Sequence, residues 1–300
     1  MTEFQLNLRE RLPNVELRFD EPMSRHTSFR IGGSVTVMAF PKSAEELAQI
    51  MKVSALLDTK PVILGAGTNV LAPDGGMDAL VICLKDCMGG MERLDDTHIR
   101  VAAGVTMTRA AVFASNLGLS GMEFAHGIPG TVGGGVYMNA GAYGGEIKDI
   151  CVSVDVMDMQ GNITRRNKEE MGFAYRHSRL EDEQGIVLAA EFELVPSTVE
   201  SVREKMQELL RKRSASQPLD LPSAGSAFKR PVGGFAAALI DQAGLKGFTV
   251  GGAAISTKHA GFAVNVGGAT AADVRALLKQ VSDIVFEKSG IRLEPEVRIW

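Results

Sequence analysis

The sequence contains one glycine-dense stretch, Phe124 to Glu146, which reads FAHGIPGTVGGGVYMNAGAYGGE and has eight glycines among its 23 residues. Glycine adopts positive φ at little cost and lets backbone N–H groups approach a ligand closely. Successive N–H groups in such turns form concave sites that favour anions, phosphate above all. Apolar residues such as Val132 and Val136 interrupt the stretch, so it differs from a flexible linker. The pattern predicts a loop wrapped on a phosphate-bearing cofactor; the alternative is glycine packing between two strands.

Composition narrows the classes of protein to consider. Three hundred residues with 45% apolar content can bury a sizeable core and suggest two domains, or one domain with a lobe. A net charge of −4 disfavours a nucleic-acid or anionic-membrane partner. No apolar run approaches the roughly 18 residues of a membrane span, and the charged N-terminus lacks the apolar core of a signal peptide, which favours the cytoplasm. The three cysteines and five histidines show no metal-ligand or disulfide spacing.

Hydrophobic periodicity predicts a mixture of helices and strands. A capping box at Ser43–Glu46 opens a helix that reaches about residue 57. Further elements are expected before residue 196, namely a helix at about 108–117 and strands at 61–64, 79–84, 98–102, 151–159 and 186–195. The succession of elements indicates an α+β or mixed α/β architecture.

A shift in composition near residue 196 predicts a domain boundary. Pro196 and a second capping box, Ser197–Glu200, lead into a charged helix that ends near residue 213. The chain beyond it has its own strands and a Thr270-capped helix to about residue 288. We therefore predict a first region at 1–195, with subdomains of about 1–75 and 76–195, and a second domain at 196–300.

A second glycine loop, Gly65 to Val70, follows a predicted strand. It resembles half of a dinucleotide-binding fingerprint, but the third glycine is missing and no clear helix follows, so the Rossmann assignment fails. The chain also lacks the GxxxxGK[ST] pattern of a P-loop. Two phosphate-sized loops fit a long dinucleotide better than they fit a single phosphate.

Three short motifs carry polar or charged residues that could be functional. Tyr175–Ser178 contains Arg176, Ser223–Pro231 contains a serine followed by two cations, and Glu294–Arg298 contains two carboxylates. From the residues alone, each also fits a simpler interpretation: a surface arginine, an ordinary loop and an exposed edge strand, respectively.

Together, and in this order, these stretches resemble the UDP-N-acetylenolpyruvoylglucosamine reductase family. The resemblance runs nearly end to end and rests on HTSFRIGG (26–33), ILGAGTNVL (63–71), GIPGTVGGGVYMNAGAYGGEI (127–147), FAYRHS (173–178), PSAGSAFKRP (222–231), GLKGFTVGGAAIS (244–256), KHAGFAVN (258–265) and LEPEVR (293–298). It implies an α+β chain with the FAD-binding fold of vanillyl-alcohol oxidase in two subdomains, plus a C-terminal α+β substrate-binding domain. The chain is similar to the short form of the family, which lacks an extra tyrosine-bearing loop.

The resemblance also implies a reaction in two halves. NADPH reduces bound FAD, and UDP-N-acetylglucosamine enolpyruvate is then reduced to UDP-N-acetylmuramate for peptidoglycan synthesis, on which cell shape and division depend. Arg176, matched on the YRHS motif, would bind and polarise the substrate carboxylate. Ser226, matched on AGSAFK, would donate a proton to the substrate carbon. Glu296, matched on EVR, would act protonated or as an orienting partner, and the terminal strand would return to the active site.

Binding residues follow from the same matches. Backbone groups expected at FAD are those of Gly65, Ala66, Gly67, Thr68, Asn69, Val70, Gly127, Ile128, Gly130, Thr131, Gly133 and Gly134, with Asn139, Gly141 and Ala142 near the flavin. Lys229 and Arg230 are the cations expected at the substrate diphosphate. We expect a small-molecule substrate, no nucleic-acid or membrane partner, no metal, and a monomer or weak oligomer.

Two rival interpretations stay open from the sequence. One is an FAD-dependent oxidase or dehydrogenase of the same fold that acts on an alcohol or hydroxy acid, in which His126 could tether the flavin covalently. The other is a nucleotide-binding module without redox chemistry. The co-occurrence of YRHS, AGSAFK and EVR argues against both, since neither needs all three motifs.

Overall fold

Two compact units share the chain in a discontinuous way. The computed structural model describes residues 1–300. The first unit comprises Met1–Phe19, Thr36–Ala66 and Ala79–Arg211, and the second comprises Asp20–Val35, Gly67–Asp78 and Lys212–Trp300. Both units therefore combine segments that are distant in sequence. The functional domains expected from the sequence, 1–195 and 196–300, stay a prediction. The two compact units divide the chain differently, because each contains several separate segments.

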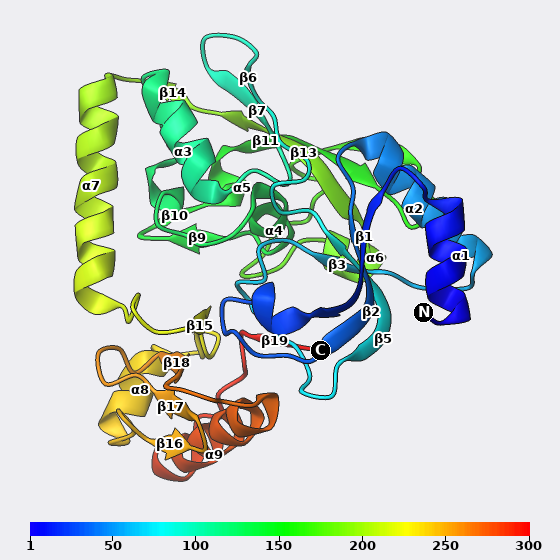
Figure 1. The fold of residues 1–300 in the computed structure, drawn as a ribbon. Helices are drawn as coiled ribbons and strands as arrows, with labels where there is room; N and C mark the ends of the chain where they lie inside the picture. Colours follow the sequence, from blue (N-terminus) through cyan, green and yellow to red (C-terminus); the bar gives the residue numbers. More distant parts are fainter. The chain divides into compact units, whose positions relative to one another are not determined.

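The N-terminal part combines two capped helices with a small sheet. Thr2 and Gln5 form a capping box at α1 (Glu3–Arg11), and Ser43 caps α2 (Ala44–Leu56). Figure 1 shows the two helices side by side in blue. The sheet has the order β1-β2-β5-β3. Its strands are β1 (Glu16–Pro22), β2 (Ser34–Phe40), β3 (Val62–Leu64) and β5 (Met77–Cys83), and β3 and β5 run parallel.

A larger antiparallel sheet forms the centre of the first unit. Its order is β12-β11-β13-β7-β6. The strands are β6 (Met91–Arg93), β7 (His98–Ala102), β11 (Cys151–Met157), β12 (Ile163–Asn167) and β13 (Ile186–Glu193). The strands predicted near 98–102, 151–159 and 186–195 are thus confirmed. Beside the sheet lie α3 (Met107–Asn116), α4 (Val132–Tyr137) and α5 (Ile147–Ile150), as Figure 1 shows.

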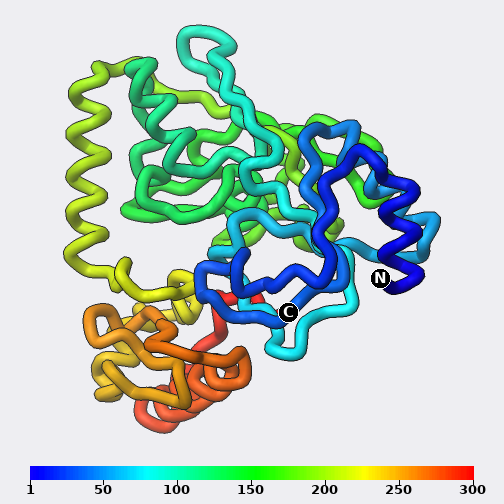
Figure 2. The backbone as a smooth tube through the Cα atoms, in the orientation of Figure 1, coloured from blue at the N-terminus to red at the C-terminus, as the bar shows by residue number.

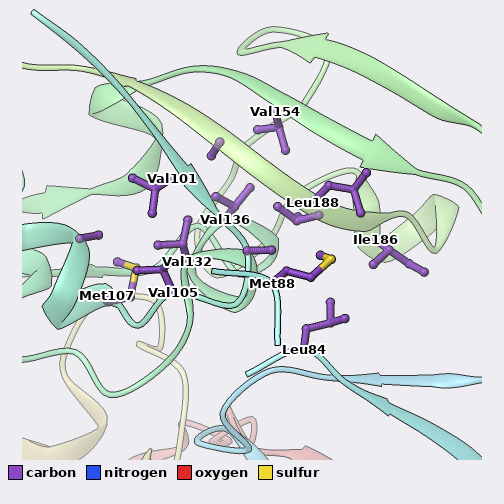
Figure 3. Close-up of a cluster of buried hydrophobic side chains, with 14 of the residues drawn as sticks. Leu84, Met88, Val101, Val105, Met107, Val132, Val136, Val154, Ile186 and Leu188 are labelled. Atoms are coloured by element: carbon purple, nitrogen blue, oxygen red, sulfur yellow. The ribbon is translucent and has the colours of Figure 1, made fainter. Parts of the chain in front are cut away.

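Helix α4 forms inside the glycine-dense stretch and packs on the central sheet. Val132 and Val136 are fully buried, and Figure 3 shows them in one hydrophobic cluster with Val101 of β7 and Leu188 of β13. The sequence pattern predicts a loop over this whole stretch, and the helix corrects that prediction. Helix propensity is low for a segment with three consecutive glycines. Tertiary burial of the two valines outweighs that cost.

The second unit is a four-stranded antiparallel sheet covered by helices. The sheet has the order β15-β18-β17-β16, with β15 (Ser223–Ser226), β16 (Thr249–Val250), β17 (Ala253–Ile255) and β18 (Phe262–Asn265). Helices α8 (Ala236–Gln242) and α9 (Ala271–Ser289) share a hydrophobic core with this sheet. One core cluster buries Phe29 and Leu71 with residues of the C-terminal part, such as Leu277. β19 (Arg298–Ile299) pairs in parallel with β4 (Val70–Leu71), so the red end of the tube in Figure 2 lies beside this early segment.

Helix caps agree with the predicted boundaries, with two corrections. The Ser43 hydroxyl accepts a 3.2 Å hydrogen bond from the Glu46 N–H, but the Glu46 carboxylate accepts from the Lys42 N–H, so the box is only half formed. The N-cap of α7 (Val199–Ser216) is Thr198 rather than Ser197, because the Ser201 N–H donates to the Thr198 hydroxyl. The capping box of Thr270 at α9 is complete.

Further short elements lie along the chain. They are η1 (Met23–Arg25), β8 (Leu119–Ser120), η2 (Glu123–Ala125), β9 (Gly141–Ala142), β10 (Gly145–Glu146), α6 (Leu180–Glu183) and β14 (Val195–Pro196). None of the helices is both long enough and apolar enough to span a membrane.

Candidate active site

The two glycine loops meet at Gly65 and Thr131 in the first unit. Thr131 is the N-cap of α4, and its hydroxyl accepts a 3.2 Å hydrogen bond from the Gly134 N–H. A Cβ added to Gly65 would lie 2.7 Å from that hydroxyl oxygen. Since real Cβ atoms do not approach so closely, glycine at position 65 is what lets the loops approach.

Part of the glycine stretch fits the packing alternative. The Gly133 N–H donates to the Ala103 carbonyl oxygen at 2.9 Å, and an added Cβ would lie 2.9 Å from the Ala103 side chain. At Gly135, an added Cβ would lie 2.7 Å from the Met107 sulfur. These glycines let α4 pack closely, and the N–H groups of Gly133 and Gly134 are already bonded within the protein. The cofactor role expected for both residues stays a prediction.

The loop from Gly67 onward belongs to the second unit and is bound tightly to the segment around Ser28. Gly67 has φ of +63°, and an added Cβ would lie 1.9 Å from the His26 carbonyl oxygen. The Ser28 N–H donates to the Gly67 carbonyl at 3.0 Å, and the Ser28 hydroxyl donates to the Ser223 carbonyl at 2.6 Å. Ser28 therefore joins this loop to the strand that carries Ser226.

His126, at the edge of the glycine stretch, has a buried ring nitrogen without a protein partner. Its Nδ1 makes no hydrogen bond, while its carbonyl oxygen accepts one from the Thr108 hydroxyl at 2.6 Å. Burial lowers the pKa of this imidazole. A buried ring nitrogen of this kind calls for a polar partner that the protein itself does not supply, which fits a bound cofactor beside the loop.

Arg176 lies in a tight turn with left-handed backbone geometry. Its φ is +53°, and the turn is closed by a bridge between Ala174 and His177. One guanidinium nitrogen donates to the Gly141 carbonyl at 3.2 Å, and the guanidinium lies 5.1 Å from the Tyr175 ring centre. A non-glycine residue rarely adopts this geometry, so the surrounding hydrogen bonds must hold the turn.

Ser226 and Glu296 are brought together in the second unit. Ser226 ends β15 as an exposed residue, and the next residue, Ala227, accepts a 3.0 Å hydrogen bond from the Glu296 N–H. The Asn69 amide donates to the Glu296 carbonyl at 3.3 Å, and β19 pairs with β4 directly afterwards. Residues from three distant parts of the sequence thus bring the main chain of Glu296, which precedes β19, beside the end of β15, where Ser226 lies.

Comparison with known proteins identifies the family. A profile described as "UDP-N-acetylenolpyruvoylglucosamine reductase, C-terminal domain" matches residues 217–300, and an "FAD binding domain" profile matches residues 35–167. The UDP-N-acetylenolpyruvoylglucosamine reductase of Caldanaerobacter subterraneus is 44% identical over 97% of this chain and 96% of the relative. That of Lactococcus lactis (strain MG1363) is 43% identical over 97% of this chain and 96% of the relative. This chain belongs to the UDP-N-acetylenolpyruvoylglucosamine reductase family.

Solved structures agree with that assignment. The crystal structure of UDP-N-acetylenolpyruvylglucosamine reductase from Thermus caldophilus superimposes with a TM-score of 0.79 and 34% identity, over 96% of this chain and 99% of that chain. An alkyldihydroxyacetonephosphate synthase shares the fold alone, with a TM-score of 0.51 and 16% identity over 65% of this chain and 41% of that chain. The predicted fold class, an α+β FAD-binding fold with a further C-terminal domain, is confirmed.

The chain is an FAD-dependent oxidoreductase, and its residues fit the cofactor. The glycine approach at Gly65 and the unpartnered nitrogen of His126 both lie at loops expected to hold FAD. In contrast, the Asn139 side chain is fully buried and is hydrogen-bonded to Glu146, Ala174 and Lys148. Gly141 and Ala142, also expected near the flavin, form β9 and pair with β10.

The predicted diphosphate cations already have neighbours within the second unit. The Lys229 ammonium pairs with the carboxylate of Glu294, and the Arg230 guanidinium lies 4.4 Å from the Phe235 ring centre. The Lys229 N–H also donates to the Glu294 carbonyl at 2.9 Å. The local sequence gives no sign that Glu294 pairs with Lys229, although both residues lie in motifs that carry the family resemblance.

Ser28 and Asn139 are the other residues whose structural roles were missed. Ser28 lies within HTSFRIGG, and Asn139 within the glycine stretch, so both were inside recognised motifs. Their partners, at Ser223 and Ala174, are distant in sequence and had no signal in the local pattern. The division into units assigns Arg176 to the first unit and both Ser226 and Glu296 to the second.

Proposed function

We propose that this chain catalyses the NADPH-dependent reduction of UDP-N-acetylglucosamine enolpyruvate to UDP-N-acetylmuramate, a step in peptidoglycan precursor synthesis. The observation that carries the proposal is the similarity, over nearly the full length, to reductases of this name, with 44% identity to the Caldanaerobacter relative. It includes a match of the C-terminal domain over the residues that contain Ser226 and Glu296. When bound, FAD supplies the hydride chemistry.

Arg176 binds the substrate carboxylate in this proposal. A guanidinium presents a fixed fork of donors that suits a planar carboxylate, and it stays charged at any relevant pH. Negative charge develops next to that carboxylate as the double bond is reduced, so a fixed cation stabilises it. Support comes from the turn that holds Arg176 and from the bond of its guanidinium to the Gly141 carbonyl.

Ser226 donates the proton that completes the reduction, and Glu296 assists. An alcohol is a weak acid, so its effect on the rate depends on its position. A positioned general acid typically raises the rate by about 10²–10⁴-fold. The exposed Ser226 side chain and the backbone bond between Ala227 and Glu296 support this pairing. A charged Glu296 would repel the developing negative charge, so the proposal has it protonated or hydrogen-bonded as an orienting group.

Lys229 and Arg230 bind the diphosphate of the substrate in this proposal. Phosphate oxygens attract both cations strongly, and Lys229 must exchange its pairing with Glu294 for the substrate. That pairing is largely exposed to solvent and therefore weak, so the exchange costs little. We place the reaction in the cytoplasm and the protein in solution as a monomer or weak oligomer, without a nucleic-acid or membrane partner.

The test is a visible spectrum of the purified protein, recorded without oxygen. A flavin spectrum that bleaches with NADPH and recovers when UDP-N-acetylglucosamine enolpyruvate is added is the expected result. Recovery with oxygen alone would instead indicate an oxidase, and flavin that stays with acid-denatured protein would indicate a covalent link. A protein that takes up no FAD would overturn the proposal.

A further inference from the structure

The Asn139 side chain makes three hydrogen bonds, which join it to the segment 146–148 and to Ala174. Its amide nitrogen donates to Glu146 Oε2 at 2.7 Å and to the Ala174 carbonyl oxygen at 2.9 Å. Its amide oxygen accepts from the Lys148 N–H at 2.9 Å. The residue is fully buried and has φ of +43°, in the left-handed region. An amide shape with two donors and one acceptor is therefore required at this point.

The bond to Ala174 reaches the turn that presents Arg176. Ala174 and His177 close that turn, and Arg176 has left-handed geometry between them. Two more bonds join the same turn to the glycine stretch: the Arg176 guanidinium donates to Gly141, and the buried Ser178 hydroxyl donates to the Tyr137 carbonyl at 2.7 Å. Asn139 lies between Tyr137 and Gly141 in sequence, so its bond is the central one of three.

We propose that Asn139 is a positioning residue, whose side chain holds the Arg176 turn in place to receive the substrate carboxylate. Its polar atoms are all engaged by the protein, so its side chain does not serve the cofactor directly. This inference rests on the proposed function, because the role of Arg176 comes from there. It differs from the expectation that Asn139 lies at the flavin as a binding residue.

Energetics favour a strong effect on the turn. A buried polar group that loses its partner costs more than the net value of one hydrogen bond, and left-handed geometry at Arg176 needs the surrounding bonds to persist. A displacement of about 1 Å in a positioning group can lower a rate by about 10²-fold. The half-reaction in which the substrate accepts hydride from reduced flavin should therefore slow. Reduction of the flavin by NADPH should not, because it involves no substrate carboxylate.

The test compares Asn139→Gly with Asn139→Asp in the FAD-loaded protein. Glycine accepts the positive φ but removes all three bonds; aspartate keeps the shape but places a second carboxylate against Glu146. For both variants we expect the FAD dissociation constant and the rate of flavin reduction by NADPH within about twofold of the parent. The rate of flavin reoxidation by subsaturating substrate should fall about 10²-fold. Ser54→Ala is the matched control, because it removes a buried hydrogen bond, to Ile50, within α2.

A double-mutant cycle separates positioning from general damage. In an Arg176→Ala background, Asn139→Gly should slow reoxidation by less than about twofold, because the group that it positions is gone. Hydrogen exchange of the segment 173–178 gives a readout without turnover, and exchange there should be faster in Asn139→Gly but unchanged in Ser54→Ala.

Each result has one meaning. Equal losses in both half-reactions, or weaker FAD binding, would assign Asn139 to the cofactor and overturn the inference. Full additivity with Arg176→Ala would do the same. If the parent protein itself is not reoxidised by UDP-N-acetylglucosamine enolpyruvate, the proposed function fails instead. Faster exchange at 173–178 in Asn139→Gly would still show that Asn139 holds the turn.

Discussion

The backbone N–H of Glu296 donates a 3.0 Å hydrogen bond to the carbonyl oxygen of Ala227, the residue that follows Ser226. The bond is made by the main chain, so it does not depend on either functional side chain. The Asn69 amide adds a second restraint through the Glu296 carbonyl. Substitutions of the serine hydroxyl or the glutamate carboxyl should therefore change the chemistry without moving the main chain at Ala227 and Glu296.

Ser226→Ala tests the proton donor. We expect it to keep bound FAD and rapid reduction by NADPH, while substrate reduction falls by about 10²–10⁴-fold, because no positioned acid remains. Rapid-mixing absorbance of the two half-reactions measures this. Ser223→Ala, on the same strand, is the control, since its hydroxyl bonds the Ala263 carbonyl at 2.8 Å in a structural role. Equal turnover in Ser226→Ala and the parent would remove Ser226 from the role.

Glu296→Gln tests the carboxyl group. The backbone hydrogen bond to Ala227 is retained, so the free energy of unfolding should stay within about 0.5 kcal/mol of the parent value. The amide cannot supply a proton to Ser226, and we expect reoxidation by substrate to slow by at least about 10-fold, with flavin reduction by NADPH unchanged. Full activity in this variant would show that the Glu296 carboxyl group does not assist the reaction.

Gly67→Ala tests the close approach between the second glycine loop and His26. The left-handed backbone alone costs about 1–2 kcal/mol with a side chain, and the new Cβ would meet the His26 carbonyl at 1.9 Å. We expect the free energy of unfolding to fall by at least about 2 kcal/mol, measured by urea denaturation. Gly89→Ala has open space around the new atom and should stay within about 0.5 kcal/mol.

His259 should make stability depend on pH. Burial lowers its pKa below the ordinary 6.5, and its Nδ1 accepts a 3.1 Å hydrogen bond from the Gly261 N–H, which only a neutral ring can do. The unfolded chain binds the proton more readily, so stability is full above about pH 6.5 and is lost as pH falls below it. His259→Asn should flatten the fall in melting temperature between pH 7 and pH 5.5. His126 is shifted in the same direction, so the slope should shrink rather than vanish.

Local patterns predicted many of the longer helices and strands, because burial follows sequence periodicity. The alternation at 151–159 corresponds to β11, and the Thr270 cap begins α9. Motif resemblance predicted the family, the FAD cofactor and the fold. Nothing local could reveal α4, because its three glycines disfavour a helix and its burial against β13 depends on residues some fifty positions later.

The candidate site was predicted as a set of residues but not as an arrangement. Sequence order gave no sign that Asn69 would bond Glu296, or that Asn139 would bond Ala174. Such pairs depend on which strands become neighbours, which is a property of the whole fold. The engaged N–H groups of Gly133 and Gly134 follow from the same cause, since the packing of α4 decides them.

The discontinuous second unit has a consequence for synthesis. Phe29 and Leu71 are buried in a cluster completed by residues such as Leu277. At about 5–20 residues per second, a ribosome needs roughly 10–40 s to pass from the early segments to the region after residue 212. Throughout that interval these apolar side chains lack the C-terminal residues that bury them in the finished fold. The main-chain bond between Glu296 and Ala227 and the pairing of β19 with β4 both have to wait for the last residues of this sequence to be synthesised.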